Sequence, residues 1–204
     1  MQIFFFLILI FSIILHEVAH GYAADKLGDP TARLQGRLTL NPIPHIDLFG
    51  SIILPLISIM APGGFLFGWA KPVPYNPYNL TRAPRWGETI VAAAGPATNF
   101  ALAFLFAGLL RFSADQTFIA ICLTGVVANL WLGILNLIPI PPLDGSKVLD
   151  ALLPRALSRG YSEWKTRMEQ NPFLGFGLVL VLILFFGNTF ANLIYALASV
   201  LAGI

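Results

Sequence analysis

Two histidines and a glutamate near the start of the chain form the strongest chemical pattern in the sequence. HEVAH at 16–20 places two imidazoles four residues apart, with a carboxylate directly after the first. On a helix, this spacing puts His16 and His20 one turn apart on the same face, where both can reach one Zn²⁺. Glu17 is then placed to act on a water molecule that the metal activates. The pattern predicts the site of a metal-dependent hydrolase.

The residues before this motif make a functional role more convincing. Residues 3–15, IFFFLILIFSIIL, form an apolar run that leads directly into the motif. Ionisable side chains at the end of such a run are costly in hydrocarbon unless they face a protein interior and have partners. The alternative, a polar helix end with two incidental histidines, does not explain why the chain bears this cost.

Composition indicates the class of protein. Hydrophobic residues make up 57% of the chain, charged residues 11%, and the mean hydropathy is +0.78, whereas a soluble domain carries about 25% charge. The chain is therefore expected to be an integral membrane protein. The net charge of +2 is spread without a basic run, so nucleic acid is not an expected partner. Cys122 is the single cysteine, which excludes an internal disulfide and a CxxC zinc site.

Apolar stretches predict how the chain is arranged in the membrane. They cover 3–24, 48–69, 90–111, 117–138 and 173–204, and about 20 residues make one helical crossing. The connections are short, so we expect a single domain over 1–204. We predict an all-α polytopic membrane protein with about five to six transmembrane or re-entrant helices. The last stretch is too long for one straight crossing, and we expect Gly187-Asn188 to divide it.

Two connecting segments favour short β-strands at the membrane surface. Residues 37–50 and 69–80 are rich in proline, asparagine and alternating apolar residues, which suits edge strands better than helices. Our hypothesis is that the edges around 37–41 and 71–75 hold an extended substrate by strand addition.

A second acidic element, NLIPIPPLDG at 136–145, ends with an aspartate and a glycine. If Asp144 is the third ligand, it must lie at the same depth in the membrane as the two histidines. All three residues are near the C-terminal end of their helices. The two helices then run parallel, which requires one crossing between them rather than two. Pro55 and the proline-glycine cluster at 62–64 make 48–69 the segment that turns back before crossing.

The distribution of positive charge supports the same topology. With 48–69 re-entrant, 11 lysines and arginines share one side and Arg111 lies alone on the other, whereas a spanning 48–69 gives 8 against 4. Basic residues gather on the cytoplasmic side, so the N-terminus is expected outside and the catalytic end toward the cytoplasm of the cell membrane. The 11 residues are Lys26, Arg33, Arg37, Lys71, Arg82, Arg85, Lys147, Arg155, Arg159, Lys165 and Arg167.

Three motifs in this order resemble those of the site-2 protease family of intramembrane zinc metalloproteases, peptidase family M50. They are HEVAH at 16–20, AAGPATNF at 93–100 and NLIPIPPLDG at 136–145. HIDLFGSIILP at 45–55 and GWAKPVPYNP at 68–77 resemble the compact branch without PDZ or CBS domains. The resemblance implies that His16, His20 and Asp144 bind zinc and that Glu17 is the catalytic base.

The resemblance also implies two substrate-binding residues. Asn99 corresponds to a polar residue that helps to hold substrate near the metal, and its alternative role is an interhelical hydrogen bond. Asn136 has a similar expected role, with satisfaction of backbone groups at a turn as its alternative. His45 is the one histidine outside the motif, and a hydrogen bond within its own loop is favoured over metal binding.

These observations predict a zinc metalloendopeptidase that cleaves peptide bonds in or near transmembrane segments of membrane proteins. Its partners would be transmembrane substrates and the lipid bilayer; the sequence leaves the oligomeric state open. Two alternatives come from other classes: a membrane transporter, and a zinc-binding scaffold without activity. A scaffold needs no base beside the first histidine, so Glu17 argues against it.

Overall fold

The computed structural model describes residues 2–60 and 68–203. Its longest elements are helices, because hydrocarbon offers no partner for backbone polar groups and a helix satisfies them internally. Four helices are long and apolar enough to cross a membrane, so the chain is a multi-pass membrane protein. They are α1 (Gln2–Leu27), α4 (Gly87–Leu109), α5 (Gln116–Asn136) and α8 (Pro172–Ala202).

Shorter helices connect these four. Between α1 and α4 lie α2 (Thr31–Leu34), a 3-10 turn (Ile43–His45), a π-helical turn (Leu48–Ile53), α3 (Leu54–Met60) and a 3-10 turn (Pro77–Asn79). A 3-10 turn (Leu110–Phe112) ends α4, while α6 (Gly145–Leu152) and α7 (Arg155–Gln170) join α5 to α8.

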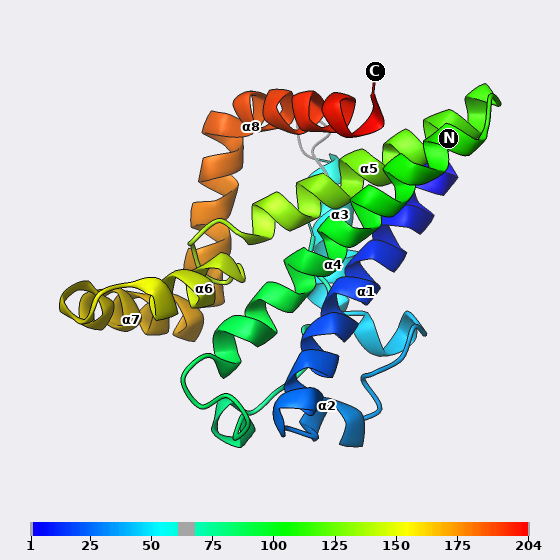
Figure 1. Cartoon of the computed structure of the whole chain (residues 1–204). Helices are drawn as coiled ribbons and strands as arrows, with labels where there is room; N and C mark the ends of the chain where they lie inside the picture. The colour runs from blue at the N-terminus through cyan, green and yellow to red at the C-terminus, as the bar shows by residue number, and fades with distance from the viewer. Residues whose placement is uncertain (1, 61–67, 204) are drawn as a thin grey trace.

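Helices α1, α4 and α5 lie side by side and form the core of the molecule (Figure 1). In this view α4 runs opposite to α1, and α5 runs opposite to α4, so α1 and α5 point the same way. This is the parallel arrangement that a ligand at the end of each helix requires. One crossing, α4, separates them in the chain.

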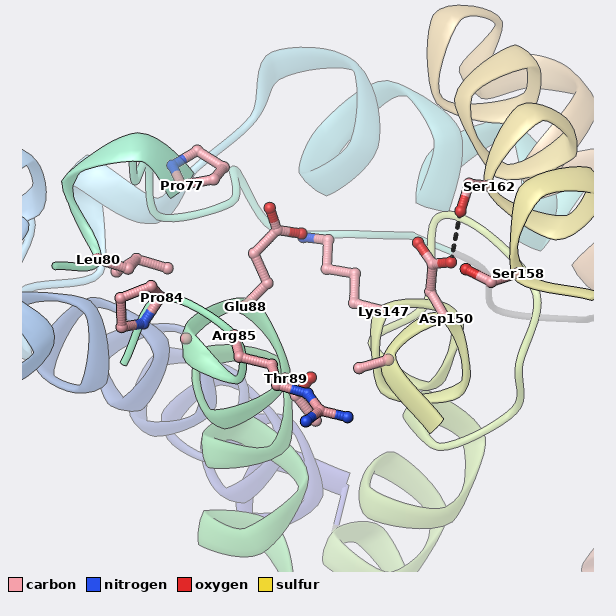
Figure 2. Close-up of a pocket in the computed structure, with 12 residues that line it drawn as sticks. Pro77, Leu80, Pro84, Arg85, Glu88, Thr89, Lys147, Asp150, Ser158 and Ser162 are labelled. Carbon is pink, nitrogen blue, oxygen red and sulfur yellow. Dashed lines mark hydrogen bonds between the residues drawn. The ribbon is translucent and has the colours of Figure 1, made fainter. Parts of the chain in front are cut away.

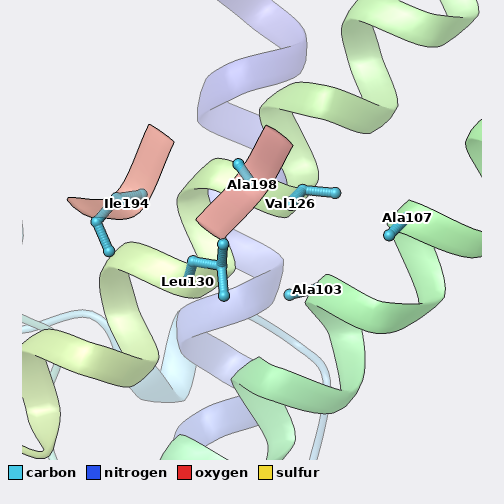
Figure 3. Packing of buried hydrophobic residues seen from close by; sticks show 6 residues of the cluster. All are labelled: Ala103, Ala107, Val126, Leu130, Ile194 and Ala198. Atoms are coloured by element: carbon cyan, nitrogen blue, oxygen red, sulfur yellow. The ribbon is translucent and has the colours of Figure 1, made fainter. Parts of the chain in front are cut away.

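Small residues let α4 and α5 approach closely. A Cβ at Gly125 would lie 2.5 Å from the ring of Phe106, so a larger residue there would force the two helices apart. Helices in hydrocarbon gain no hydrophobic drive toward each other and associate through close van der Waals packing. Small and aliphatic residues of α4 and α5 form a buried hydrophobic cluster, to which the second half of α8 adds two residues (Figure 3). The cluster consists of Ala103, Ala107, Val126, Leu130, Ile194 and Ala198.

The two ends of the segment 48–69 lie close together. The backbone N–H of Trp69 donates to the carbonyl of Gly50 at 3.0 Å, so the chain comes back to its starting point. The helical part, Leu48–Met60, is too short to cross. This agrees with a segment that turns back, although the cluster at 62–64 lies outside the described residues. Five or six membrane helices were expected, and four spans are found in the described chain.

The expectation of short surface strands was wrong. No strand forms within 2–60 and 68–203. Prolines in both segments remove backbone donors, so no continuous ladder of hydrogen bonds can form. Side chains take the place of a partner strand: the guanidinium of Arg37 donates to the carbonyls of Lys71 and Pro72, and the carboxylate of Glu17 accepts from the N–H of Val73.

Helix α8 is continuous through Gly187 and Asn188, where a division was expected. Its axis nevertheless bends sharply near the middle, so that its orange half stands upright and its red half lies across the top of the view (Figure 1). The 31 residues of α8 therefore form one bent helix and not two separate ones.

A buried carboxylate joins the end of α1 to the chain before α4. Asp29 is fully buried, and its oxygens accept hydrogen bonds from Thr31 Oγ1 at 2.6 Å, the Asn76 N–H at 2.7 Å and Asn79 Nδ2 at 2.9 Å. Burial raises the pKa of Asp29, but these hydrogen bonds outweigh it, so the pKa lies below its ordinary value. The ionised carboxylate therefore stabilises the fold.

Replacing Asp29 with asparagine is expected to lower the free energy of unfolding by about 2–3 kcal/mol at pH 7, because the amide keeps one acceptor oxygen but its NH₂ group would face a present donor, the Asn76 N–H. A lowered folded-state pKa gives stability above the unfolded value of about 3.9, which is lost as the pH falls further. Thermal unfolding in detergent should therefore show a gap between the two proteins that narrows below pH 4. Asp25→Asn is the control, because Asp25 pairs with the exposed Arg33 and should cost under about 1 kcal/mol; equal losses would contradict the prediction.

Candidate metal centre

The two histidines of the motif face inward from α1 toward α4. His16 is 6% exposed and His20 is 8% exposed. Directly opposite them on α4 is Gly95, where a Cβ would lie 2.5 Å from the His20 ring and 2.6 Å from the His16 ring. Glycine is therefore required at this position, because the backbone of α4 forms one wall of the imidazole site.

Asp144 meets the two histidines at the end of the proline-rich turn that follows α5. Its Oδ2 atom lies 3.1 Å from His16 Nε2 and 3.3 Å from His20 Nε2, and the two nitrogens are 3.0 Å apart. Ligands bound tetrahedrally to Zn²⁺ at about 2.0–2.1 Å are about 3.3 Å from one another. The three atoms thus form a triangle close to one face of a zinc tetrahedron.

The hydrogen bond of His20 shows which of its nitrogens carries the proton. Nδ1 lies 2.7 Å from the carbonyl oxygen of Val91, which can only accept, so Nδ1 donates. In the neutral imidazole, Nε2 then presents a lone pair toward His16 and Asp144. This is the arrangement of a metal-binding histidine, which donates its other ring N–H to a carbonyl or carboxylate.

Two hydrogen-bonded asparagines fix which nitrogen of His16 carries the proton. The Gly125 carbonyl can only accept, so Asn129 donates to it through Nδ2 at 2.9 Å. Asn129 Oδ1 then accepts from Asn99 Nδ2 at 3.1 Å, and Asn99 Oδ1 accepts from His16 Nδ1 at 2.6 Å. Each amide orientation follows from the one before it. One backbone carbonyl on α5 thereby fixes the proton of His16 on Nδ1.

Three electron-pair donors consequently point at one another. Asp144 Oδ2 is buried and has no hydrogen-bond partner in the described part of the chain. Two imidazole lone pairs and a carboxylate oxygen repel unless a cation lies between them. Two nitrogens and one oxygen, with a fourth position open, form the donor set of catalytic zinc sites. His16, His20 and Asp144 therefore fit a zinc ion.

Glu17 lies beside this triangle and is half-buried. Its Oε2 atom accepts a hydrogen bond from the backbone N–H of Val73 at 2.9 Å. One carboxylate oxygen is thus held by the protein and the other is left for a water molecule. This is a suitable arrangement for the general base that the motif predicts.

The predicted substrate contacts have local partners. Asn99 is fully buried with both ends of its amide in use, so it supports His16 and has no atom exposed to a substrate. Asn136 donates to the carbonyl of Leu132, one turn earlier in α5. His45 donates to the carbonyl of Thr39, in agreement with a hydrogen bond inside its own loop.

Two residues of the site were missed by reasoning from the sequence. Asn129 could have been noticed, because an amide within an apolar span needs a partner and is often functional. Arg37 gives no such signal, since an arginine in a proline-rich connection resembles an ordinary surface cation. Its burial becomes visible only in the folded structure, where it is 7% exposed.

A polar cavity of about 300 Å³ lies one helical turn from the metal ligands (Figure 2). Glu88 and Thr89 at the start of α4 precede Val91, the partner of His20, while Lys147 follows Asp144 on α6. Ser158 and Ser162 of α7 lie opposite in the figure, with Ser162 hydrogen-bonded to Asp150. Water can therefore come within one turn of the site.

A larger groove of about 530 Å³ runs along the other side of the motif and is mostly apolar. It lies between α1, α4 and the bend at residues 38–40. Leu15, Val18 and Ala19 from α1 and Ala94 and Thr98 from α4 line it. These residues are the immediate neighbours of His16, Glu17, His20, Gly95 and Asn99 in the sequence, so the groove lies beside the helical turns that carry the metal site, on a neighbouring face.

Comparison with known proteins identifies the family. The model of peptidase family M50 matches residues 4–115 and 111–184. The chain belongs to this family. Together these matches cover most of the chain, including all three motifs that the sequence singled out. No solved structure matches the chain significantly.

Relatives of this M50 peptidase carry related names. "Putative zinc metalloprotease YwhC" of Bacillus subtilis is 38% identical over 184 residues, 85% of this chain and 77% of the relative. Rip2 of Mycobacterium tuberculosis, named in the same way, is 34% identical over 87% of this chain and 64% of its own length. Zinc metalloprotease MJ0392 of Methanocaldococcus jannaschii is 27% identical over 95% of this chain and 45% of its own length. The chain thus spans under two thirds of the last two.

A methyl group at Gly95 is expected to abolish zinc binding, because the Cβ would occupy the space of both imidazole rings. Zinc content of purified Gly95→Ala should fall from about one ion per chain to background, as measured by elemental analysis. Gly108→Ala on the same helix has nothing within 4 Å of the new Cβ and should keep its zinc. Full zinc content in Gly95→Ala would show that α4 does not form the wall of the site.

Asn129 is expected to affect zinc affinity without touching the metal, because it fixes the amide that orients His16. Outer partners of a ligand typically contribute 10- to 100-fold in affinity, so Asn129→Ala should weaken zinc binding about tenfold in a chelator competition. Thr124→Val removes a comparable hydrogen bond to the preceding turn of α5 and serves as the control. An unchanged affinity in Asn129→Ala would refute the relay.

Proposed function

We propose that this chain is an intramembrane zinc metalloprotease, in which His16, His20 and Asp144 hold the metal and Glu17 is the catalytic base. The observation that carries the proposal is the convergence of two imidazole nitrogens and a carboxylate oxygen at 3.0–3.3 Å, beside a carboxylate held by a backbone N–H. Membership of peptidase family M50 supports it.

The chemistry follows from the residues around the site. Zinc, when bound, supplies a Lewis acid that polarises the scissile carbonyl and lowers the pKa of water to about 7. The free oxygen of Glu17 accepts a proton from the attacking water, and the same carboxyl passes it to the leaving amine. On the side of α4, the backbone at Gly95 packs directly against the two buried histidine rings.

The depth of the site supports substrates within the membrane. His16 lies about 17 Å along the helix axis from the end of α1 at Leu27, and the hydrocarbon core is about 30 Å thick. A transmembrane substrate hides its carbonyls in helical hydrogen bonds, so it must unwind locally before cleavage.

The apolar groove is a suitable place for such an unwound segment. Leu38, Thr39 and Leu40 flank it, and their backbone N–H groups make no hydrogen bond within the described residues. These groups can pair with an extended peptide while the groove receives its apolar side chains. The segment 71–75 has fewer free groups, because Arg37 and Glu17 already occupy them.

The active site is proposed to open toward the cytoplasm of the cell membrane. Most lysines and arginines follow the C-terminal end of α1, precede α4 or lie after α5, which favours this end as the cytoplasmic one. The polar cavity between α4, α6 and α7 lies at the same end and supports a route for water.

Replacing Glu17 with glutamine is expected to abolish cleavage and to leave the metal in place, because the amide cannot accept the proton and the three ligands are untouched. We would incubate both purified proteins in detergent with a panel of single-span membrane peptides, and measure zinc content together with cleavage. Loss of at least about 1000-fold in kcat is expected. Glu163→Gln, at an exposed glutamate of α7, should cleave normally.

Other outcomes would identify a different protein. Equal cleavage by wild type and Glu17→Gln would remove the catalytic base from the mechanism. Bound zinc without any cleavage by the wild type would favour an inactive scaffold, and absence of zinc from both proteins would favour a transporter.

A further inference from the structure

An extended segment crosses the site and is held by a different part of the molecule at almost every residue. We refer to residues 69–76 as the strap. Its contacts outside itself include Trp69 N–H to Gly50, the Trp69 carbonyl to Ser51 Oγ, Lys71 N–H to His45, Lys71 and Pro72 carbonyls to Arg37, Val73 N–H to Glu17, the Tyr75 ring to Lys147, and Asn76 N–H to Asp29. Side chains and two separate backbone carbonyls thus replace the neighbouring strand that a sheet would provide.

Arg37 is the one cation among these contacts that is almost completely buried, at 7% exposed. One of its terminal nitrogens donates to the Lys71 carbonyl at 2.8 Å and to the Pro72 carbonyl at 3.3 Å. Its Nε is buried without a partner, and Arg37 is in none of the ion pairs of the described chain. A buried charge without a counter-ion is costly. Such a cost is expected where the residue serves a function.

The carbonyls that Arg37 holds are directly before the group that contacts the catalytic base. The peptide unit made of the Pro72 carbonyl and the Val73 N–H is planar, so fixing its oxygen also fixes the direction of its hydrogen. Pro72 and Pro74 on either side have fixed φ angles, which limits how far the strap can adjust. Val73 itself is 5% exposed.

We infer that Arg37 is a positioning residue for the catalytic base: it orients the peptide unit 72–73, whose N–H holds one oxygen of Glu17 so that the other faces the water. This inference rests on the proposed function. It assigns Arg37 a role in the rate of the chemical step. It predicts no role in metal binding, because Arg37 touches none of His16, His20 and Asp144.

The test compares Arg37→Gln with Arg37→Lys and with Arg82→Gln. Arg82 also donates from a terminal nitrogen to a backbone carbonyl, that of Lys26 in the last turn of α1 at 2.8 Å, but it has no link to Glu17. Zinc content, KM and kcat would be measured on a transmembrane peptide cleaved by the wild type. Arg37→Gln should lower kcat about tenfold with zinc content and KM within about twofold, because misorientation of a catalytic group affects the chemical step. Arg37→Lys should regain part of the rate, and Arg82→Gln should match the wild type.

A second variant removes the proposed link itself. Incorporation of the α-hydroxy analogue of valine at position 73 replaces the N–H by an ester oxygen and leaves the side chain in place. This protein should also lose about tenfold in kcat. Combined with Arg37→Gln, the total loss should stay near tenfold, because both changes break the same chain of contacts.

Several results would overturn the inference. A hundredfold loss in the combined protein would mean that Arg37 and the Val73 N–H act independently. Loss of zinc, or a rise in KM alone, would assign Arg37 to folding or to substrate binding. Failure of the proposed function is recognised separately, because the wild type would then not cleave, or Glu17→Gln would cleave as well as the wild type.

Discussion

Three ligand atoms meet in the interior of this protein, and the surrounding contacts decide which nitrogen of each imidazole ring faces the other two atoms. The Val91 carbonyl accepts from Nδ1 of His20, and Asn99 accepts from Nδ1 of His16, so Nε2 of each ring faces the site. Both contacts come from α4, whose Gly95 also permits the close approach. The packing of α1 against α4 therefore does more than bury surface: it decides which ring nitrogen of each histidine faces the metal site. Most other features of the fold, including the small residues between α4 and α5, maintain this one alignment.

Local patterns in the sequence predicted the parts of the site that depend on local geometry. The spacing of His16 and His20 requires only a helix, and the need to match the depth of Asp144 to theirs was enough to predict that the helix of the histidines and the helix before Asp144 run parallel. The interhelical hydrogen bond given as the alternative role of Asn99 does form, but its partner, His16, was not predictable, because it depends on which face α4 turns toward α1. The surface strands were wrongly predicted for a related reason: alternation and prolines describe an extended backbone, but whether its partners are strands or side chains is decided by distant residues such as Arg37.

The two hollows near the motif differ in character, as an enzyme acting in a membrane requires. The groove beside α1 and 38–40 is apolar and has free backbone groups, whereas the cavity next to α6 is lined by charged and hydroxyl side chains. A peptide from the bilayer and water from the aqueous side need opposite surroundings. The ligands lie on α1 and after α5, and α4 packs against both helices. Residues of α4 border the apolar groove and the polar cavity alike.

The positions of the ligands along the chain also affect how the molecule assembles. His16 and His20 belong to the first span, whereas Asp144 follows the third, and about 120 residues lie between them. A metal held by all three closes this loop and acts as a cross-link between segments that enter the bilayer at different times. Helices in lipid attract one another only weakly, so such a cross-link contributes directly to keeping the bundle together. The zinc ion would thus have a structural role as well as a catalytic one, and its loss would weaken the packing of the helices as well as stop the reaction.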